Sequence, residues 1–108
     1  MSDRTYTEDD VKHEKSAKTY SISLDNGKKA ILNYEEFNDS GQKSADLWHT
    51  EVPTECRGKG IAGILASKAI TDLASNSDYQ NIVLSCSYLQ SYYKKNCNNL
   101  KDFSNIKL

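Results

Sequence analysis

The chain has 108 residues and a formal net charge of -1, with 37% hydrophobic and 27% charged residues. This length suits one domain with one core. The near-neutral charge gives no general electrostatic reason to bind nucleic acid or an anionic membrane. No apolar run approaches the ~20 residues that cross a bilayer, and the acidic start MSDRTYTEDD lacks the apolar segment of a signal peptide. We therefore expect neither a nucleic-acid partner nor a membrane partner.

The cysteine pattern favours free thiols. Cys56, Cys86 and Cys97 are odd in number and widely spaced, which argues against a disulfide framework. The sequence contains no CxxC pair and no Cys/His cluster, so we expect no metal site. These features predict a reduced intracellular protein, in the cytoplasm and with nuclear access open.

The first half of the chain reads as antiparallel strands. We expect residues 1–10 to be flexible and residues 11–108 to form a single domain. VKHEK predicts a short strand, and the alternation of TYSISL is typical of a half-buried one. The turn residues DNG join TYSISL to a returning strand, KKAILNYEEF, and NDSG joins that to a third strand, KSADLWHTEV. The third strand ends at Pro53, which cannot donate to a sheet ladder.

The second half predicts a helix, a buried strand and a second helix. A helix from Ile61 to near residues 75–78 has one broad apolar face, formed by Ala62, Leu65, Ala66, Ala69, Ile70 and Leu73. NIVLSC is a short strand of the kind buried on both faces, SYLQSYYKKN predicts a short helix, and the last twelve residues stay unassigned. The third strand, the helix and NIVLSC should form a parallel crossover attached to the antiparallel strands. The predicted fold class is therefore α+β, a mixed α/β sandwich.

The stretch ECRGKGIAGILASKAI places two glycines directly before a good helix former. Each glycine costs a helix up to about 1 kcal/mol relative to alanine. Gly58 and Gly60 would let an anion approach the unpaired amides at the helix start, and Arg57 and Lys59 would add positive charge. The spacing is neither that of a P-loop nor GxGxxG. A basic turn that simply starts a helix is the alternative that this stretch leaves open.

The wider segment VPTECRGKGIAGIL resembles the acyl-CoA-binding motif [QR]-x-x-G-x-[GA] of the GNAT superfamily of acetyltransferases. Residues 57–62 fill that motif completely. Many members read V-x-P-E-x-R-G, whereas the proline of this chain stands one position early. With HTEVP before it and SCSYLQSYYKKN after it, the chain looks like the short single-domain branch of N-acetyltransferase domain-containing protein 1-like proteins. The resemblance spans residues 46–96 and implies a GNAT-like acyl-CoA N-acyltransferase fold of minimal size.

This resemblance also implies a cosubstrate, acetyl-CoA, and the residues that hold it. Amides of the turn would wrap the CoA pyrophosphate, and these belong to Arg57, Gly58, Lys59, Gly60, Ile61 and Ala62. The strand around Thr50 and Val52 would hydrogen-bond the pantetheine arm. The thioester would lie where this strand and residues 82–85 splay apart, because unpaired backbone groups there can bind an amide-rich ligand.

Transfer to an amine needs a base, and an acid for the departing thiolate. Cys86 ends the buried strand at the expected cleft, where its thiol either accepts an acetyl group or lines the pocket as a small hydrophobe. Tyr93 matches the tyrosine acid of the family pattern [FL]-Y-x-K-x-G-F, although the Gly-Phe that follows is missing. A core-anchoring aromatic is the alternative for this residue.

Candidate bases lie on the third strand. His49 is the natural base near neutral pH, or a structural residue that is hydrogen-bonded. Strict alternation places His49 and Glu51 on one face, and Asp46, Trp48 and Thr50 on the other. Some amine-acetylating relatives use a strand carboxylate, so Asp46 and Glu51 are alternatives for the base.

The sequence thus predicts an acetyl-CoA-dependent N-acetyltransferase. The branch lacks the extra helices that usually shape an acceptor site, which favours a protein or peptide lysine, or a polyamine, over an enclosed metabolite. The alternative is a non-catalytic acyl-CoA-binding or sensing module that uses the same turn. A second alternative is an interaction domain whose basic turn binds an acidic partner.

Overall fold

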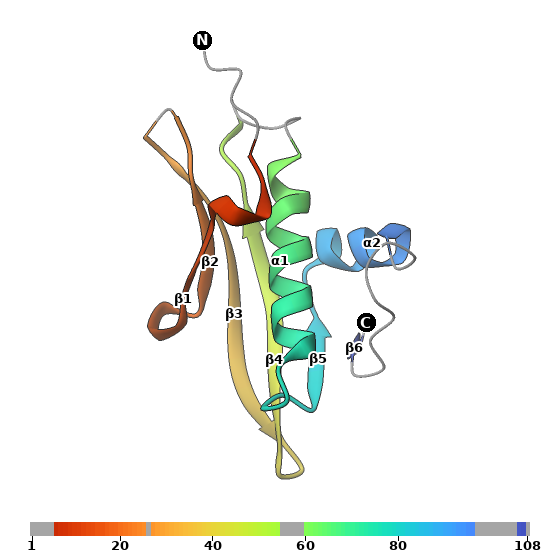
Figure 1. The fold of residues 1–108 in the computed structure, drawn as a ribbon. Helices are drawn as coiled ribbons and strands as arrows, with labels where there is room; N and C mark the ends of the chain where they lie inside the picture. The colour runs from red at the N-terminus through yellow and green to blue at the C-terminus, as the bar shows by residue number, and fades with distance from the viewer. Residues whose placement is uncertain (1–5, 26, 55–59, 97–105, 108) are drawn as a thin grey trace.

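The computed structural model describes residues 6–25, 27–54, 60–96 and 106–107, which form one mixed sheet covered by helices (Figure 1). The sheet has six strands in the order β1-β2-β3-β4-β5-β6. The elements in chain order are η1 (Glu8–Asp10), β1 (Val11–Glu14), η2 (Lys15–Ala17), β2 (Thr19–Ser23), β3 (Lys29–Asp39), β4 (Gln42–Glu51), α1 (Ile61–Ser75), β5 (Asn81–Leu84), α2 (Ser87–Asn96) and β6 (Ile106–Lys107). The predicted α+β class and the predicted order of elements are confirmed.

The first four strands are antiparallel, and β4, β5 and β6 run parallel to one another. The turns between strands have the expected chemistry. Gly27 has φ +82°, and Ser40 and Gly41 both have positive φ, the combination of a tight hairpin turn. The β4-α1-β5 unit is the predicted parallel crossover, and β6 adds a strand from the tail that the sequence left unassigned.

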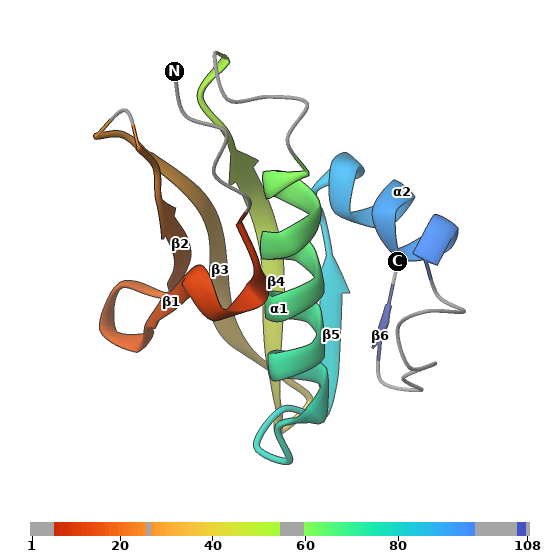
Figure 2. The same ribbon diagram turned by 45° about the horizontal axis from the view of Figure 1, so that its top comes forward.

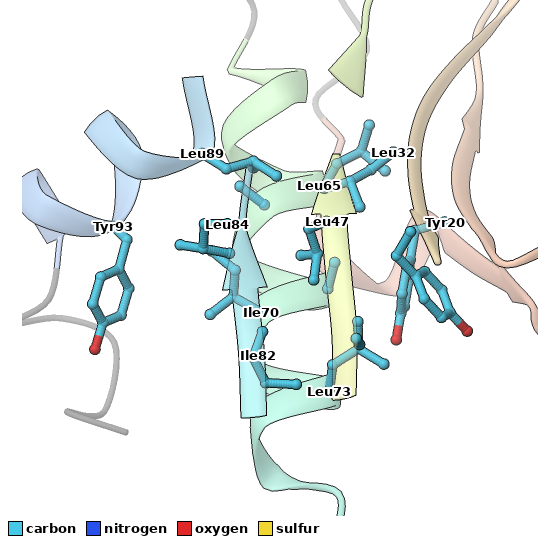
Figure 3. Close-up of a cluster of buried hydrophobic side chains, with 14 of the residues drawn as sticks. Tyr20, Leu32, Leu47, Leu65, Ile70, Leu73, Ile82, Leu84, Leu89 and Tyr93 are labelled. Carbon is cyan, nitrogen blue, oxygen red and sulfur yellow. The ribbon is translucent and has the colours of Figure 1, made fainter. Parts of the chain in front are cut away.

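Both α-helices lie on one face of the sheet, among the residues that the structure describes (Figure 2). The apolar side of α1 packs against β1 to β5, and α2 lies across the carboxyl end of β5. Figure 3 shows the resulting core, in which the fully buried side chains include Leu32, Leu47, Leu65, Ile70, Ile82, Leu84 and Leu89. The buried alanines of α1 let the helix sit close to the sheet. The opposite face of the sheet carries none of the described helices.

Residues 6–10 contact the rest of the fold, while the expected flexibility of residues 1–10 stays a prediction. Tyr6 is buried in the core, and its hydroxyl accepts a hydrogen bond from the amide of Asp25 at 3.1 Å. Thr7 and Asp10 form a reciprocal capping box around η1. One aromatic anchor and one cap therefore hold a segment whose acidic composition alone suggested a loose terminus. Residues 1–5 lie outside the described residues, and their flexibility stays a prediction.

Candidate functional site

The sheet opens at the carboxyl ends of β4 and β5. The two strands pair only from Ser44↔Asn81 to Leu47↔Leu84. The amides of Ser85 and Cys86 then both donate to the carbonyl of Leu47, at 3.1 and 3.2 Å. Beyond Leu47, β4 continues to Glu51, and among the described strands it pairs there only with β3. The expected splay is therefore present, and none of the described strands lies along the other edge of β4 over its last residues.

A β-bulge at Trp48 decides which side chains of β4 face the helices. Asn33 is opposite His49 while Tyr34 is opposite Leu47, so β4 carries one extra residue between them. Directly opposed residues share a face of the sheet. The side chains of β4 therefore do not alternate strictly, and the predicted division of its residues between the two faces of the sheet is wrong.

Because of the bulge, the candidate bases share a face of the sheet in a different combination from the predicted one. Thr50 is opposite Leu32, which is fully buried, and so belongs to the face that the helices cover. His49 and Glu51 lie on the uncovered face. Asp46 is opposite Glu35 and shares that uncovered face with them, rather than the face of Thr50. A single inserted residue thus brings three titratable side chains to one side.

Cys86 and Thr50 meet where β4 and β5 diverge. The thiol of Cys86 donates to Oγ1 of Thr50 with a sulfur–oxygen distance of 3.9 Å, in a partly buried position. Cys86 is a free thiol and is half-buried. Two residues that the sequence assigned to the site, one for chemistry and one for the cosubstrate, are therefore in contact across the opening.

The start of α1 has the backbone that a close ligand requires. Gly60 caps the helix with φ +74° and ψ 12°, a left-handed conformation that most side chains avoid, and no side chain caps the helix there. A Cβ at Gly60 would meet no atom of the described residues within 4 Å, so these residues leave space beside it. Ile61 is buried and Ala62 is half-buried. The first-turn amides of such a helix lack intrahelical partners and favour anions.

The rest of the predicted turn lies outside the described residues. The roles predicted for Arg57, Gly58 and Lys59, which precede Gly60 in the motif, therefore stay predictions. Val52 follows β4 and is half-buried, and its role toward pantetheine is likewise a prediction.

Two stacked tyrosines of α2 stand beside the helix start. The rings of Tyr88 and Tyr92 have centroids 6.1 Å apart. A Cβ on Gly63 would lie 3.3 Å from Cε2 of Tyr92 and 3.9 Å from the hydroxyl of Tyr88, so α1 and α2 approach closely at this glycine. An open hollow of about 470 Å³ adjoins them, lined by Thr7, Glu8, Gly60, Gly63, Ile64, Ser67 and Tyr92.

Tyr88 is a site residue that the sequence analysis did not single out. Burial raises the pKa of its hydroxyl, and the nearby Tyr92 and Cys86 raise it further. The ring is nevertheless 41% exposed. Its hydroxyl therefore stays protonated near neutral pH and can donate a hydrogen bond beside Cys86. The available signal was its position, two residues after the cysteine that ends the buried strand.

Tyr93, the predicted acid, is buried, and Figure 3 shows its ring on the side of β5 that faces away from Leu47. Its role as the acid stays a prediction. The alternative, an aromatic that anchors α2 to the core, agrees with its burial.

Some polar groups of the uncovered face have hydrogen-bonding capacity that the described residues do not use. Trp48 is 45% exposed and stacks on His49 with ring centroids 5.4 Å apart. Oδ1 of Asn33 and Oδ1 of Asp46 are buried and have no hydrogen-bond partner among the described residues. A buried acceptor without a donor is costly, so both atoms suit a ligand that brings N–H groups.

The described part of the chain includes no group of three or more His, Cys, Asp or Glu side chains that could hold a metal ion. None of its helices is long and apolar enough to span a membrane.

Comparison with known proteins agrees with this geometry. The family described as GCN5-related N-acetyl-transferase matches residues 19–103. The chain therefore belongs to the GCN5-related N-acetyltransferase family, whose domain supports acyl transfer.

Individual relatives carry the name Protein NATD1. The one from Xenopus tropicalis is 42% identical over 88 residues, which cover 80% of this chain and 75% of the relative. Those from Mus musculus and Homo sapiens are 41% and 40% identical, each over 80% of this chain and over 74% and 73% of the relative. The resemblance that the RGKG turn suggested is confirmed at the level of the family.

Proposed function

We propose that the protein is an acetyl-CoA-dependent N-acetyltransferase that receives acetyl-CoA on the helix-covered face and an amine on the uncovered face. The observation that carries this proposal is the opening between β4 and β5, bordered by the contact of Cys86 with Thr50.

The residues at the helix start fit acetyl-CoA. The unpaired amides of α1, the left-handed Gly60 and the free space beside it suit a diphosphate. Arg57 and Lys59 would add charge-assisted contacts. The edge of β4 beyond Leu47 would pair with the amides of the pantetheine arm, as one strand pairs with another. When bound, acetyl-CoA supplies an acetyl group activated as a thioester.

The uncovered face suits a cationic acceptor. Asp46, Glu51 and Glu35 all belong to it, on β3 and β4. These carboxylates favour the approach of an ammonium group. We infer that the acceptor is a lysine of a protein or peptide, or a polyamine, that lies across this open face.

Proton transfer is assigned to residues on both sides of the opening. His49 takes a proton from the ammonium group so that the neutral amine can form the new carbon–nitrogen bond. Asp46 is the alternative base, through its unpartnered Oδ1. As the carbon–sulfur bond breaks, Tyr88 donates its phenolic proton to the departing thiolate. Cys86 lines this point, either as a pocket wall or as a covalent acceptor of the acetyl group.

The test measures thiol release from acetyl-CoA with a lysine peptide and with spermidine as acceptors. We expect turnover that falls about 10²-fold or more in the variant that lacks the base, His49→Gln or Asp46→Asn. Asp39→Asn, at the far end of β3, is the matched control and should keep full activity. In Cys86→Ala, retained turnover assigns the thiol to the pocket wall, and lost turnover with intact binding assigns it to catalysis.

Calorimetric titration with CoA separates the alternatives. Binding of CoA without product on any amine would replace the transferase with a sensing module. A well-folded sample that binds neither CoA nor acetyl-CoA would end the proposal altogether. The cytoplasmic location remains part of this proposal, and the free thiol of Cys86 supports it.

A further inference from the structure

A second cavity, of about 420 Å³, lies at the other end of β4 and α1. Its walls come from β1, η2, β2, β3, β4, the last turns of α1 and the loop before β5. The lining residues are His13, Lys15, Tyr20, Tyr34, Glu36, Lys43, Asp72, Leu73, Asn76, Asp78 and Tyr79. A cavity of this size is in the range that holds small molecules.

The cavity is separate from the acyl-transfer opening. Lys43 and Thr50 are seven positions apart on β4, and each strand residue advances the chain by about 3.3 Å, so the two ends are about 20 Å apart. A reacting amine must come within about 3.5 Å of the atom that it attacks. A molecule in this cavity is therefore not positioned to receive the acetyl group.

Aromatic rings form one wall. His13 stacks on Tyr20 with ring centroids 4.1 Å apart and planes 7° apart. Tyr34 is tilted against both rings, at 5.7 Å from His13 and 5.8 Å from Tyr20. In Figure 3 the ring of Tyr20 points toward the end of α1 that carries Leu73. Tyr20 and Tyr34 are buried, and they hold in place the half-buried ring of His13, which lines the cavity.

Hydrogen bonds fix the orientation of these rings. Nε2 of His13 is 2.7 Å from the hydroxyl of Tyr34. The hydroxyl of Tyr20 donates to Asp72 at 3.2 Å, and that of Tyr79 donates to Oε2 of Glu36 at 2.5 Å. The cavity is therefore organised before any ligand arrives, which lowers the entropic cost of binding.

The carboxylates of the lining outnumber its ammonium groups. Glu36, Asp72 and Asp78 bring three carboxylates, against the two ammonium groups of Lys15 and Lys43. Lys68, outside the lining, lies 3.8 Å from Asp72 and offsets part of the charge of that carboxylate. Burial lowers the pKa of His13, so the imidazole is neutral at neutral pH. The carboxyl end of α1 adds partial negative charge.

Acceptor capacity also remains unused. Lys43 and Tyr79 both contact the same oxygen of Glu36, Oε2, so Oε1 takes part in neither interaction. Within the same residues, the carboxylate of Asp78 makes no hydrogen bond or ion pair. The ammonium of Lys43 lies 5.1 Å from the ring centre of Tyr79, so a ring of this cavity already packs against a cation.

We propose that this cavity binds a small organic cation with several N–H donors, an amine or a guanidinium compound, at a site distinct from the acyl-transfer opening. The carboxylates of Glu36, Asp72 and Asp78 hold its N–H groups, and the rings of Tyr79 and His13 line its carbon chain. The proposal holds whether or not the protein transfers acetyl groups.

The experiment uses agmatine and putrescine as probes, and succinate as the anionic comparison, with the full chain and no acetyl-CoA. Calorimetry should give saturable binding of at least one cation below about 10 mM and none of succinate. Glu36→Gln and Asp72→Asn should each weaken the affinity about tenfold, because each removes a charged acceptor. Glu14→Gln, an exposed residue of β1 on the opposite face, removes the same charge and should leave the affinity within about twofold.

Amide chemical shifts locate the bound probe, and melting temperatures confirm that each variant is folded. Changes at Asn76, Asp78 and Tyr79 support the site. The proposal is overturned if neither cation binds, if succinate binds instead, or if Glu14→Gln weakens binding equally. It is also overturned if the shifts cluster at His49 and Thr50, which would place the amine at the acceptor side of the transferase.

Discussion

The two ends of β4 offer different groups for binding. At the carboxyl end, from Trp48 onward, β4 no longer pairs with β5, and its main-chain groups on that edge are the ones proposed to bind acetyl-CoA. At the amino end, Lys43 and its neighbours form a network of side chains: Lys43 pairs with Glu36, which also accepts from Tyr79. One end offers backbone groups, and the other offers charged side chains.

This difference follows from strand length. β5 has only four residues, while β4 has ten, so pairing is complete at one end and absent at the other. A backbone site tolerates many side chains but depends on chain geometry, whereas a side-chain site depends on single hydroxyls and carboxylates. Mutations at one end should therefore leave the properties of the other end unchanged.

The largest effect is expected from Gly60→Val. A β-branched residue at φ +74° is strained by about 1–3 kcal/mol, and relief of that strain would displace the helix start. We expect acetyl-CoA affinity to fall at least about tenfold, the equivalent of ~1.4 kcal/mol. The contacts of Lys43, Glu36 and Tyr79 at the amino end of β4 should be unaffected. Unchanged amide chemical shifts of Asn76 and Tyr79 would show this.

Gly60→Asn is the matched control for that variant. Asparagine enters the left-handed region more readily than other residues, so most of the affinity should be retained. Equal affinity of the valine variant and the wild type in a calorimetric titration would show that this backbone conformation does not matter to the cosubstrate.

A pair of tyrosine variants sharpens the comparison. Tyr79→Phe removes the hydroxyl that donates to Glu36 and should lower the free energy of unfolding by about 1–2 kcal/mol, with thiol release unchanged. Tyr88→Phe should do the opposite: it keeps stability and slows thiol release, because its ring is 41% exposed and its proton is assigned to the thiolate. Denaturant melts and turnover assays on both proteins test this crossed pattern. The same effect of both variants in either assay would contradict it.

The sequence was sufficient for the fold and for part of the opening. Alternation, turn residues and the apolar face of α1 predict the order of elements, because each is a local signal. The position of Cys86 at the end of a buried strand also placed it at the opening, where it contacts Thr50.

Other features depend on long-range register and could not be predicted this way. The bulge at Trp48 is set by the pairing of β3 with β4, and no local pattern in ADLWHTE marks it. The amino-end cavity joins Tyr34 to His13 and Tyr79, which are 21 and 45 positions away. Single polar residues on separate elements carry no periodic signal. Tyr6 was missed for the same reason, as one aromatic in an acidic segment.

A smaller effect is expected from pH at the amino end. Burial lowers the pKa of His13 below its usual value of about 6.5, with Lys15 and Lys68 acting in the same direction and Asp72 opposing them. The unfolded chain therefore binds more protons in this window, so stability is full above pH 6.5 and declines as the pH falls through the folded pKa.

The test compares wild type with His13→Gln between pH 5 and 7.5. The carboxylate of Glu36 stays ionised over this range, because its pKa is lowered, mainly by the hydrogen bond from Tyr79. We expect the wild-type melting temperature to decline on acidification by about 1–3 °C more than that of the variant, after allowance for partial exposure. Parallel curves would mean that the imidazole does not contribute to the pH dependence.

The smallest net change is expected from Gly63→Ala, at the contact between α1 and α2. Alanine gains up to about 1 kcal/mol in a helix interior, but its Cβ would lie 3.3 Å from the ring of Tyr92. The two effects should nearly cancel in the wild-type background. In a Tyr92→Ala background the ring is gone, so the helix gain should emerge. The double-mutant cycle should therefore show a coupling of about 0.5–1 kcal/mol. If alanine stabilises both backgrounds equally, the two helices have room to separate, and glycine is not needed for their close approach beside the opening.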